Sequence, residues 1–415
     1  MADASLTLEG LPAELRIQII HSADHTSLGA LILASPVYYS QCVYEDRSTV
    51  QKALLYHEFR RELDALLEAV VALQIRQVYK RVGSGILESE SRHTMTTSVR
   101  MLGGRRPRQA NPDTDLSLEE MIELRRYHRH RVLPVVDRFV YWCEANLRNG
   151  MGGGVLGSLG LDMHPLTPTE RLAIIQAIYR FQINGDIISF RIRSAGSPLV
   201  WDHDKSSLTA RCLGETLGRW QLEQMQIVGC FLANTTFKAL EILVQDSNLN
   251  KVEEIKGYLD PRANMHASVP SSPCSAFGLG PIATGWRRFI GEGGLDSHAA
   301  VMSLVHRDAK IPDETAVFQP TRTVWTSCTS HLTAVIFSKP CRKETPPMVW
   351  ALMKGYTGYG PHLRDWGYLF WSDERIARMG GESLIARCLD QSDMFWRDDY
   401  RENWWLGYEA CQFRF

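Results

Sequence analysis

The chain has 415 residues and a mass of 47.1 kDa, with 44% hydrophobic residues, 22% charged residues and a formal net charge of −1. This composition is typical of a globular protein that is long enough for one large core or two smaller ones. The near-zero charge excludes a uniformly basic surface, so any contact with nucleic acid must come from a local patch.

The N-terminus and the cysteines indicate the cellular compartment. The first ten residues lack the basic flank and apolar run of a signal peptide. No stretch reaches 18 uninterrupted apolar residues, so we expect no membrane span. The nine cysteines form no CxxC pair, which is typical of reduced thiols and argues against a zinc site. We therefore expect a cytoplasmic protein that binds no metal.

Helical signals dominate the first part of the chain. Short helices are predicted around residues 11–20 and 27–33, and Pro12 and Glu14 suit the first turn of the former. Apolar residues at helical spacing then predict one long helix from about Thr49 to Val82. Residues 83–117 are rich in Gly, Ser, Arg and Pro, which predicts a flexible basic loop.

Helical periodicity returns after this loop. A helix with Ser117 near its N-terminus is predicted over 117–148, and others over 168–184, 208–246 and 372–390. The glycines at 150–154 form no phosphate loop, because no GK[ST] follows them. The pattern allows short strands at 316–325 and 333–338, but no βαβ alternation or repeat is present.

The sequence therefore predicts a mainly α fold, a multi-helix globular chain with at most a few short strands in its C-terminal half. We divide the chain into a helical N-terminal segment with its long helix (1–82), the basic loop (83–117) and a helical body (118–415). The body carries a C-terminal site of acidic and aromatic residues.

Two arginine clusters offer local cationic surface. The first lies in the predicted loop and includes Arg105 and Arg106. The second contains Arg125, Arg126 and Arg129, and on a helix Arg125, His128 and Arg129 would share one face. Arginine suits phosphate, so this stripe is a candidate for binding nucleic acid. The alternative is a solvated helix face, balanced by acidic residues at 119, 120 and 123.

The most specific motif lies near the end of the chain. Asp398, Asp399 and Glu402 form a DDxxE motif flanked by Trp396, Trp404 and Trp405. On a helix, Asp398 and Glu402 would lie one above the other, with Asp399 about 100° away. Carboxylates beside apolar rings are costly to desolvate unless they are paired, which favours a cationic ligand or a proton-transfer step.

A simpler interpretation of the motif stays open. Arg397 and Arg401 alternate with the acids, so ordinary ion pairs along a helix would account for the same residues. The DDxxE pattern also occurs at the Mg²⁺-diphosphate site of helical terpene synthases. There it lies well inside the chain with a second metal motif downstream, whereas only 13 residues follow Glu402 here.

The N-terminal segment resembles an F-box of the filamentous-fungal type. The matching residues are Leu11-Pro-x-Glu14-Leu-Arg-x-x-Ile19 and Leu31-Ile-Leu-Ala34-Ser35-Pro36, and the chain departs from the motif at Tyr38-Tyr39. The phrase Leu363-Arg-Asp-Trp366-Gly-Tyr-Leu-Phe370-Trp371-Ser-Asp-Glu374-Arg also resembles such fungal chains. The resemblance implies that residues 7–45 dock on the ubiquitin-ligase adaptor Skp1. Packing as a helical layer is the alternative role.

The acidic motif on a helical chain of this length resembles the fungal arginine-containing cyclodipeptide synthases. The resemblance implies that Asp398, Asp399 and Glu402 are required for activity. It implies that Arg-tRNA and a second aminoacyl-tRNA are joined into a cyclo(Arg-Xaa) diketopiperazine. No cofactor is expected, because the aminoacyl ester already carries the activation. The tryptophans would stack on the substrate guanidinium, and the arginine clusters would contact tRNA.

Overall fold

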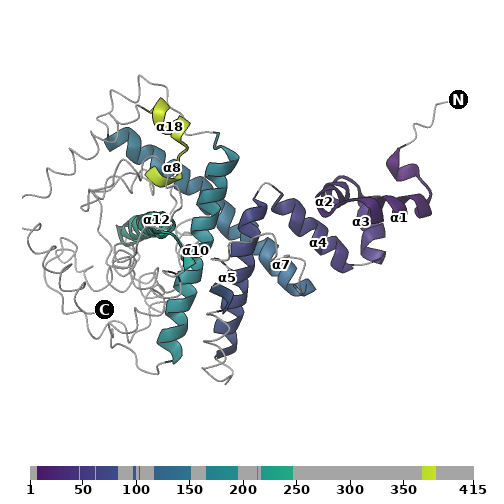
Figure 1. The fold of residues 1–415 in the computed structure, drawn as a ribbon, viewed down its shortest axis with the longest axis horizontal. Helices are drawn as coiled ribbons and strands as arrows, with labels where there is room; N and C mark the ends of the chain where they lie inside the picture. Colours follow the sequence, from purple (N-terminus) through teal and green to yellow (C-terminus); the bar gives the residue numbers. More distant parts are fainter. Residues whose placement is uncertain are drawn as a thin grey trace, which may run out of the picture.

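The computed structural model describes residues 7–45, 47–60, 62–82, 97–99, 102, 116–150, 165–194, 213, 216–245 and 367–379. Within these ranges all regular structure is helical, which confirms the predicted mainly α fold. Figure 1 shows the helices α1 to α4 extending from one side of a larger bundle. The predicted strands at 316–325 and 333–338 lie outside the described residues.

The N-terminal unit consists of η1 (Leu8–Gly10), α1 (Ala13–Ser22), α2 (His25–Ala34), α3 (Pro36–Glu45) and α4 (Arg47–Glu58). Asp24 caps α2 by accepting hydrogen bonds from the N–H groups of Thr26 and Ser27. The unit has a small core of its own, which α4 completes. The core residues are Ile20, Leu28, Ile32, Tyr38, Cys42, Val50, Ala53 and Leu54.

Helices α2 and α4 approach closely at Gly29. A Cβ atom at this position would lie 2.4 Å from Cβ of His57 and 2.5 Å from the carbonyl oxygen of Ala53. Both distances are far below van der Waals contact, so only glycine fits without a shift of one helix. Gly29 therefore fixes how α2 lies on α4.

The single helix predicted from Thr49 to Val82 is wrong. The chain instead forms α4 and α5 (Leu63–Val82), with a break at residues 59–62. The break places buried Phe59 in the main core and lets Glu62 accept a hydrogen bond from Arg171 at 2.9 Å. Val50, Ala53 and Leu54 of α4 belong to the N-terminal core, whereas Leu55, Phe59 and the buried apolar residues of α5 belong to the main core.

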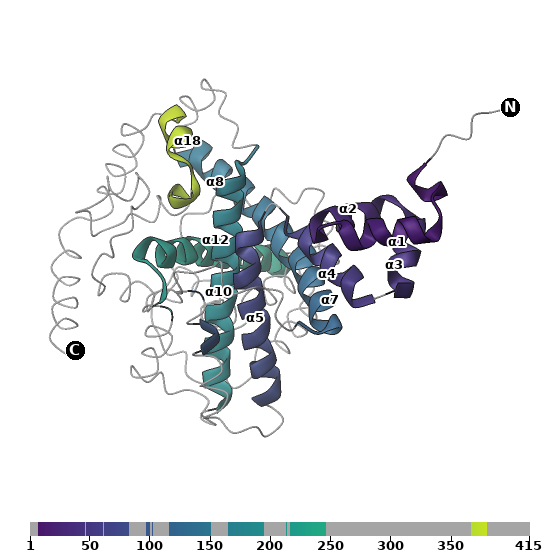
Figure 2. The same cartoon turned by 45° about the vertical axis from the view of Figure 1, so that its right-hand side comes forward.

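The body is built around α10 (Pro168–Ser194), which packs against α5, α8 and α12. Its residues 177–187 are all buried, as expected for a helix surrounded by others. The body also contains α7 (Leu118–Tyr127), η2 (His128–Val132), α8 (Leu133–Gly150) and α12 (Arg219–Gln245). Figure 2 shows α5 and α10 side by side, in agreement with their contacts.

The predicted start of a helix at Ser117 is confirmed by a complete capping box. The Ser117 hydroxyl accepts from the Glu120 N–H at 3.3 Å, and the Glu120 carboxylate accepts from the Ser117 N–H at 2.7 Å. The predicted helix over 117–148 is present as α7, η2 and α8, and η2 is a turn of π-helix between the two α-helices.

A short C-terminal segment completes the core of the body. It comprises η7 (Tyr368–Phe370) and α18 (Asp373–Arg378), separated by Trp371 and Ser372. Tyr368, Leu369, Phe370 and Trp371 are buried, and the Phe370 ring meets Phe139 of α8 edge-on at 5.1 Å. Gly367 begins the segment with a φ of 66°, and a Cβ there would lie 2.7 Å from Sγ of Cys143.

Candidate functional site

The acidic motif and its tryptophans lie outside the described residues. This applies to Asp398, Asp399, Glu402, Trp396, Trp404 and Trp405, and also to Arg105 and Arg106. Their roles stay predictions from the sequence. The described residues contain the second arginine cluster and the F-box-like segment, and they reveal a polar interior that the sequence did not single out.

The arginines of the second cluster have different surroundings. Arg125 is half-buried, and its Nη1 donates to Oε1 of Gln51 on α4 at 2.8 Å. Arg129 donates from Nε to Oε1 of Glu58 at 3.0 Å, and its Nη2 also pairs with this carboxylate. Arg126 is exposed, with no hydrogen bond or ion pair to another residue that the structure describes. Arg125 and Arg129 therefore join the body to α4, whereas Arg126 faces solvent.

His128 does not belong to an exposed basic stripe, contrary to the expectation from helical spacing. It is fully buried, with Nδ1 3.0 Å from the Tyr179 hydroxyl and its ring centroid 4.0 Å from that of Phe59. Burial, together with the positive charges of Arg171 and Arg129, lowers the pKa of His128 to about 3. The side chain is therefore neutral at physiological pH and adds nothing to the basic surface.

The π-helix accounts for this arrangement. The Leu133 N–H donates to the carbonyl of His128, five residues back, so one extra residue is accommodated in the turn. His128 and Val132 both face the core, and the three residues between them, Arg129, His130 and Arg131, are all exposed. Turns of π-helix are rare and occur frequently at functional sites.

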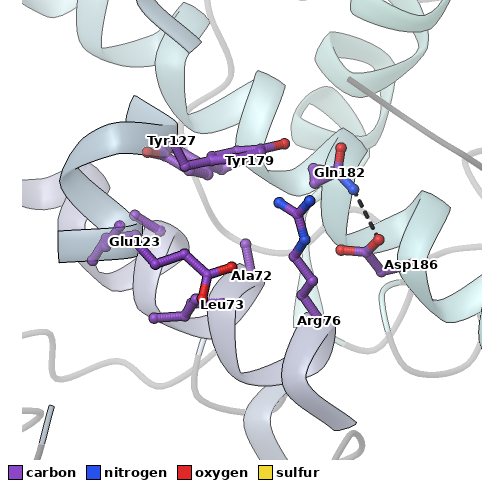
Figure 3. A pocket seen from close by; sticks show the side chains of 10 residues that line it. Ala72, Leu73, Arg76, Glu123, Tyr127, Tyr179, Gln182 and Asp186 are labelled. Atoms are coloured by element: carbon purple, nitrogen blue, oxygen red, sulfur yellow. Dashed lines mark hydrogen bonds between the residues drawn. The ribbon is translucent and has the colours of Figure 1, made fainter. Parts of the chain in front are cut away.

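A small cavity lies between α5, α7 and α10. Ten residues line it: Ala69, Ala72, Leu73, Arg76, Glu123, Leu124, Tyr127, Tyr179, Gln182 and Asp186. Figure 3 shows the Arg76 side chain extending toward the two tyrosine rings and toward Gln182. The guanidinium carbon of Arg76 lies 5.0 Å from the centroid of the Tyr127 ring, within cation–π range.

The cavity has a volume of about 20 Å³. That is room for about one water molecule, which needs roughly 10–15 Å³ of such volume, and it is too small for an amino acid. The surface of its walls is mostly apolar, although Arg76, Glu123 and Asp186 are among the lining residues. Nε2 of Gln182 donates to Oδ1 of Asp186 at 2.8 Å. The cavity is therefore not a ready substrate pocket.

A buried ion pair continues this polar interior. Nη2 of Arg180 on α10 donates to Oε1 of Glu68 on α5 at 2.7 Å, and both side chains are buried. Burial raises the pKa of Glu68, an effect that the charge of Arg180 partly offsets. Oε2 of Glu68, Nε of Arg180, Nε2 of His128 and Oδ1 of Asn184 are buried without a hydrogen-bond partner among the described residues. Buried polar atoms without a hydrogen bond destabilise the folded state. Loss of either Glu68 or Arg180 would leave a buried charge unpaired and add to this cost.

One carboxylate of the body accepts several hydrogen bonds from the C-terminal segment. Oε1 of Glu170 accepts hydrogen bonds from the N–H and hydroxyl of Ser372, both at 2.9 Å, and from Nε of Arg375 at 2.8 Å. Oε2 accepts from the Thr167 N–H at 2.9 Å and from Nη2 of Arg375 at 2.8 Å. Burial raises the pKa of Glu170, but these hydrogen bonds outweigh it and bring the pKa down to about 2.

The F-box-like segment exposes much apolar surface. Leu8, Leu15, Leu33, Tyr39, Val43 and Tyr44 are exposed and lie on η1 and the helices α1 to α3, with Tyr44 90% exposed and Leu33 57% exposed. From Thr26 to Tyr44 the chain has no Asp, Glu, Lys or Arg. Exposed apolar side chains that cluster on one unit are characteristic of a protein interaction surface.

One pattern in the sequence did indicate the polar interior, although the helical spacing of apolar residues did not. Arg180, Gln182, Asn184 and Asp186 alternate with apolar residues inside the predicted helix at 168–184 and just beyond it. A helix that is buried all round places such polar residues in the interior, where they need partners. Part of the hydrogen bonding of Glu170 was also predictable, because Thr167 and Glu170 have the spacing of a capping box.

Comparison with protein-family models, with curated proteins and with solved structures finds no match for this chain. In the part of the chain that the structure describes, no helix is long and apolar enough to cross a membrane. The same residues contain no group of three or more His, Cys, Asp or Glu side chains arranged to hold a metal ion.

Proposed function

We propose that the chain is a tRNA-dependent aminoacyltransferase that makes an arginine-containing cyclic dipeptide, cyclo(Arg-Xaa). The observation that carries the proposal is the DDxxE motif of Asp398, Asp399 and Glu402 among Trp396, Trp404 and Trp405. Paired carboxylates bind the planar guanidinium with two charge-assisted hydrogen bonds. Tryptophan faces stack on the same group. The mainly α body agrees with the fold expected from the resemblance.

The chemistry needs little beyond this site. The amine of one aminoacyl group attacks the ester carbonyl of the other, and the 3′ oxygen of that tRNA leaves. The free amine of the resulting dipeptidyl ester then attacks its own ester carbonyl, which closes the ring and releases the 3′ oxygen of the second tRNA. Each attack requires a deprotonated amine, and one carboxylate of a coupled acidic cluster can accept that proton. The ester supplies the activation, so the protein provides orientation and proximity.

The direct test is expression of this chain alone in a heterologous host, with mass spectrometry of the small molecules. We expect a cyclic dipeptide that takes up label from isotopic arginine. Asp398→Ala, Asp399→Ala and Glu402→Ala should each abolish it, whereas Glu374→Ala, at an exposed carboxylate in the first turn of α18, should not. Wild-type product from all three motif variants would contradict the assignment.

A second test addresses the amino-acid preference. A carboxylate pair matches the fork of the guanidinium, whereas the lysine ammonium is a point charge with different donor geometry. Charged tRNAs for arginine and lysine, supplied together to the purified protein, should yield the arginine product in large excess. Equal incorporation of both would exclude a bidentate carboxylate site.

The second candidate function is an F-box-like adaptor that binds Skp1. It is favoured by the exposed apolar side chains of α1 to α3, which a self-contained helical layer would not need. Leu33→Ser with Tyr44→Ser should then abolish capture of purified Skp1, while Tyr141→Ser, an exposed apolar position on α8, should leave it unchanged. Absence of Skp1 binding by the wild-type chain would remove this candidate.

A further inference from the structure

The cavity between α5, α7 and α10 holds the head group of one of the chain's own arginines, Arg76 of α5. Its guanidinium carbon lies 5.0 Å from the centroid of the Tyr127 ring, and the Tyr127 and Tyr179 rings are 6.4 Å apart and tilted by 38°. Figure 3 shows Glu123 and Asp186 on opposite sides of Arg76. The groups around this head group therefore come from α7 and α10, and they include both aromatic rings and carboxylates.

These surroundings have the chemistry of an arginine site. Tyrosine faces attract a cation, and carboxylates accept the forked N–H donors of a guanidinium. Asp186 is buried, and its Oδ1 accepts from Nε2 of Gln182 at 2.8 Å, which helps to fix the carboxylate. Ala69, Ala72 and Leu73 of α5 contribute apolar wall. Such a wall suits the methylene stem of an arginine, while the charged head reaches the polar groups.

A ligand would have to replace Arg76 rather than bind beside it. The free volume of the cavity is about 20 Å³, which is too small for a second arginine side chain. The space that Arg76 itself fills is the size of such a side chain. Arg76 is only half-buried, so it has a route to solvent. Exchange therefore requires a rotamer change of one side chain and no movement of a helix.

We propose that the cavity is a binding site for the guanidinium group of an arginine ligand, and that Arg76 fills it as a built-in competitor while the ligand is absent. The aromatic and polar groups of this guanidinium cage are Tyr127, Tyr179, Glu123, Gln182 and Asp186. A competitor on a short tether acts at an effective concentration on the order of millimolar, so the site responds to abundant ligand and not to traces. The cage contains no residue of the acidic motif, and the inference does not depend on the proposed function.

The test is calorimetric titration of L-arginine and L-lysine into wild type, Arg76→Ala and Arg126→Ala. A cage that is vacant in at most about one tenth of the molecules lowers the affinity for a ligand at least about tenfold. Arg76→Ala should therefore bind L-arginine at least about tenfold more tightly than the wild type does. L-lysine should bind more weakly to both, because an ammonium lacks the planar fork. Arg126→Ala removes an exposed arginine of α7 and should behave as the wild type.

A further variant keeps the test decisive even where Arg76→Ala does not fold. Tyr127→Leu removes the aromatic face and should weaken the binding of L-arginine by the wild type as well. N-methylguanidinium should follow the same order of affinities as L-arginine, since the cage recognises the side chain alone.

Three results would overturn the proposal. No binding of L-arginine by the wild type would mean that Arg76 is a permanent part of the core. Equal affinities of L-lysine and L-arginine would exclude a guanidinium cage. Binding that Arg76→Ala leaves unchanged and Asp398→Ala abolishes would belong to the acidic motif instead. All of these measurements are made on the purified chain without turnover, so failure to form a cyclic dipeptide would refute the proposed function and leave this inference standing.

Discussion

The N-terminal unit and the body differ in how far they bury their apolar side chains. The body surrounds α10 on several sides and buries large aromatic side chains such as Phe139, Phe231 and Tyr179 completely. The N-terminal unit has a core of only eight buried residues and leaves Leu33 and Tyr44 in solvent. Among the described residues, exposed large apolar side chains are therefore concentrated in the N-terminal unit, and the body contributes only Leu63 and Tyr141 to them.

Among single substitutions, Glu170→Gln is expected to produce the largest difference in stability between the body and the N-terminal unit. This change leaves the buried Arg375 guanidinium without its carboxylate, and breaking a buried ion pair costs about 3–5 kcal/mol. Chemical denaturation monitored by tryptophan fluorescence should show the loss in the body. Glu374→Gln, at an exposed position on the same helix, should change stability by less than about 0.5 kcal/mol. Similar effects of both variants would mean that the segment is held by its aromatic residues alone.

The same carboxylate gives the body a dependence on pH. Because the pKa of Glu170 falls from 4.5 to about 2 on folding, its contribution is complete above about pH 4.5 and is lost as the pH falls toward 2. His128, with its pKa lowered from 6.5 to about 3, also favours unfolding as the pH falls, but its effect begins near pH 6.5. Glu170→Gln should flatten the stability profile only below about pH 4.5. The slope between about pH 6.5 and 4.5, which His128 supplies, should remain in the variant, and an unchanged profile below pH 4.5 would contradict the role of Glu170.

A smaller effect, confined to the N-terminal unit, is expected from Gly29→Ala. The new Cβ would collide with His57 and with the backbone of Ala53, and overpacking of this kind costs about 1–3 kcal/mol. Hydrogen exchange should accelerate in α2 and α4 while α10 stays protected. Gly10→Ala is the matched control, since its Cβ would meet only the Thr7 hydroxyl at 3.5 Å. Equal acceleration in both regions would show that they unfold as one.

The smallest effect on stability is expected at the junction between the N-terminal unit and the body, where Arg125 and Arg129 contact Gln51 and Glu58 of α4. Arg129→Gln removes an ion pair to Glu58 in which the arginine is about half exposed, and such pairs contribute about 0.2–1 kcal/mol. Total stability should barely change, but calorimetry should resolve two transitions where the wild type shows a more cooperative one. A single sharp transition in the variant would mean that Phe59 and the helix α4 alone couple the two regions.

The class of the fold was predictable because helical periodicity and capping are local. Ser117 and its capping box, or the end of α5 at Val82, follow from residues within a turn or two. The break between α4 and α5 was missed, since it depends on two separate cores that only the folded chain defines. The inward rotation of His128 was missed for a similar reason, because a π turn leaves no clear trace in helical spacing.

The hydrogen bonds of Glu170 also bear on how the chain is made. Arg375 is 205 positions further along the chain than the carboxylate it binds, whereas the pairs that hold the N-terminal unit together are about 25 to 30 positions apart. During synthesis the N-terminal unit can therefore fold early. Phe139 can pack on Trp142 and Phe231 earlier, but its contact with Phe370 and the Glu170–Arg375 pair form only after residues 370 and 375 have left the ribosome, so the core of the body stays incomplete for most of translation. Chaperone dependence should accordingly be a property of the body, not of the unit that precedes it.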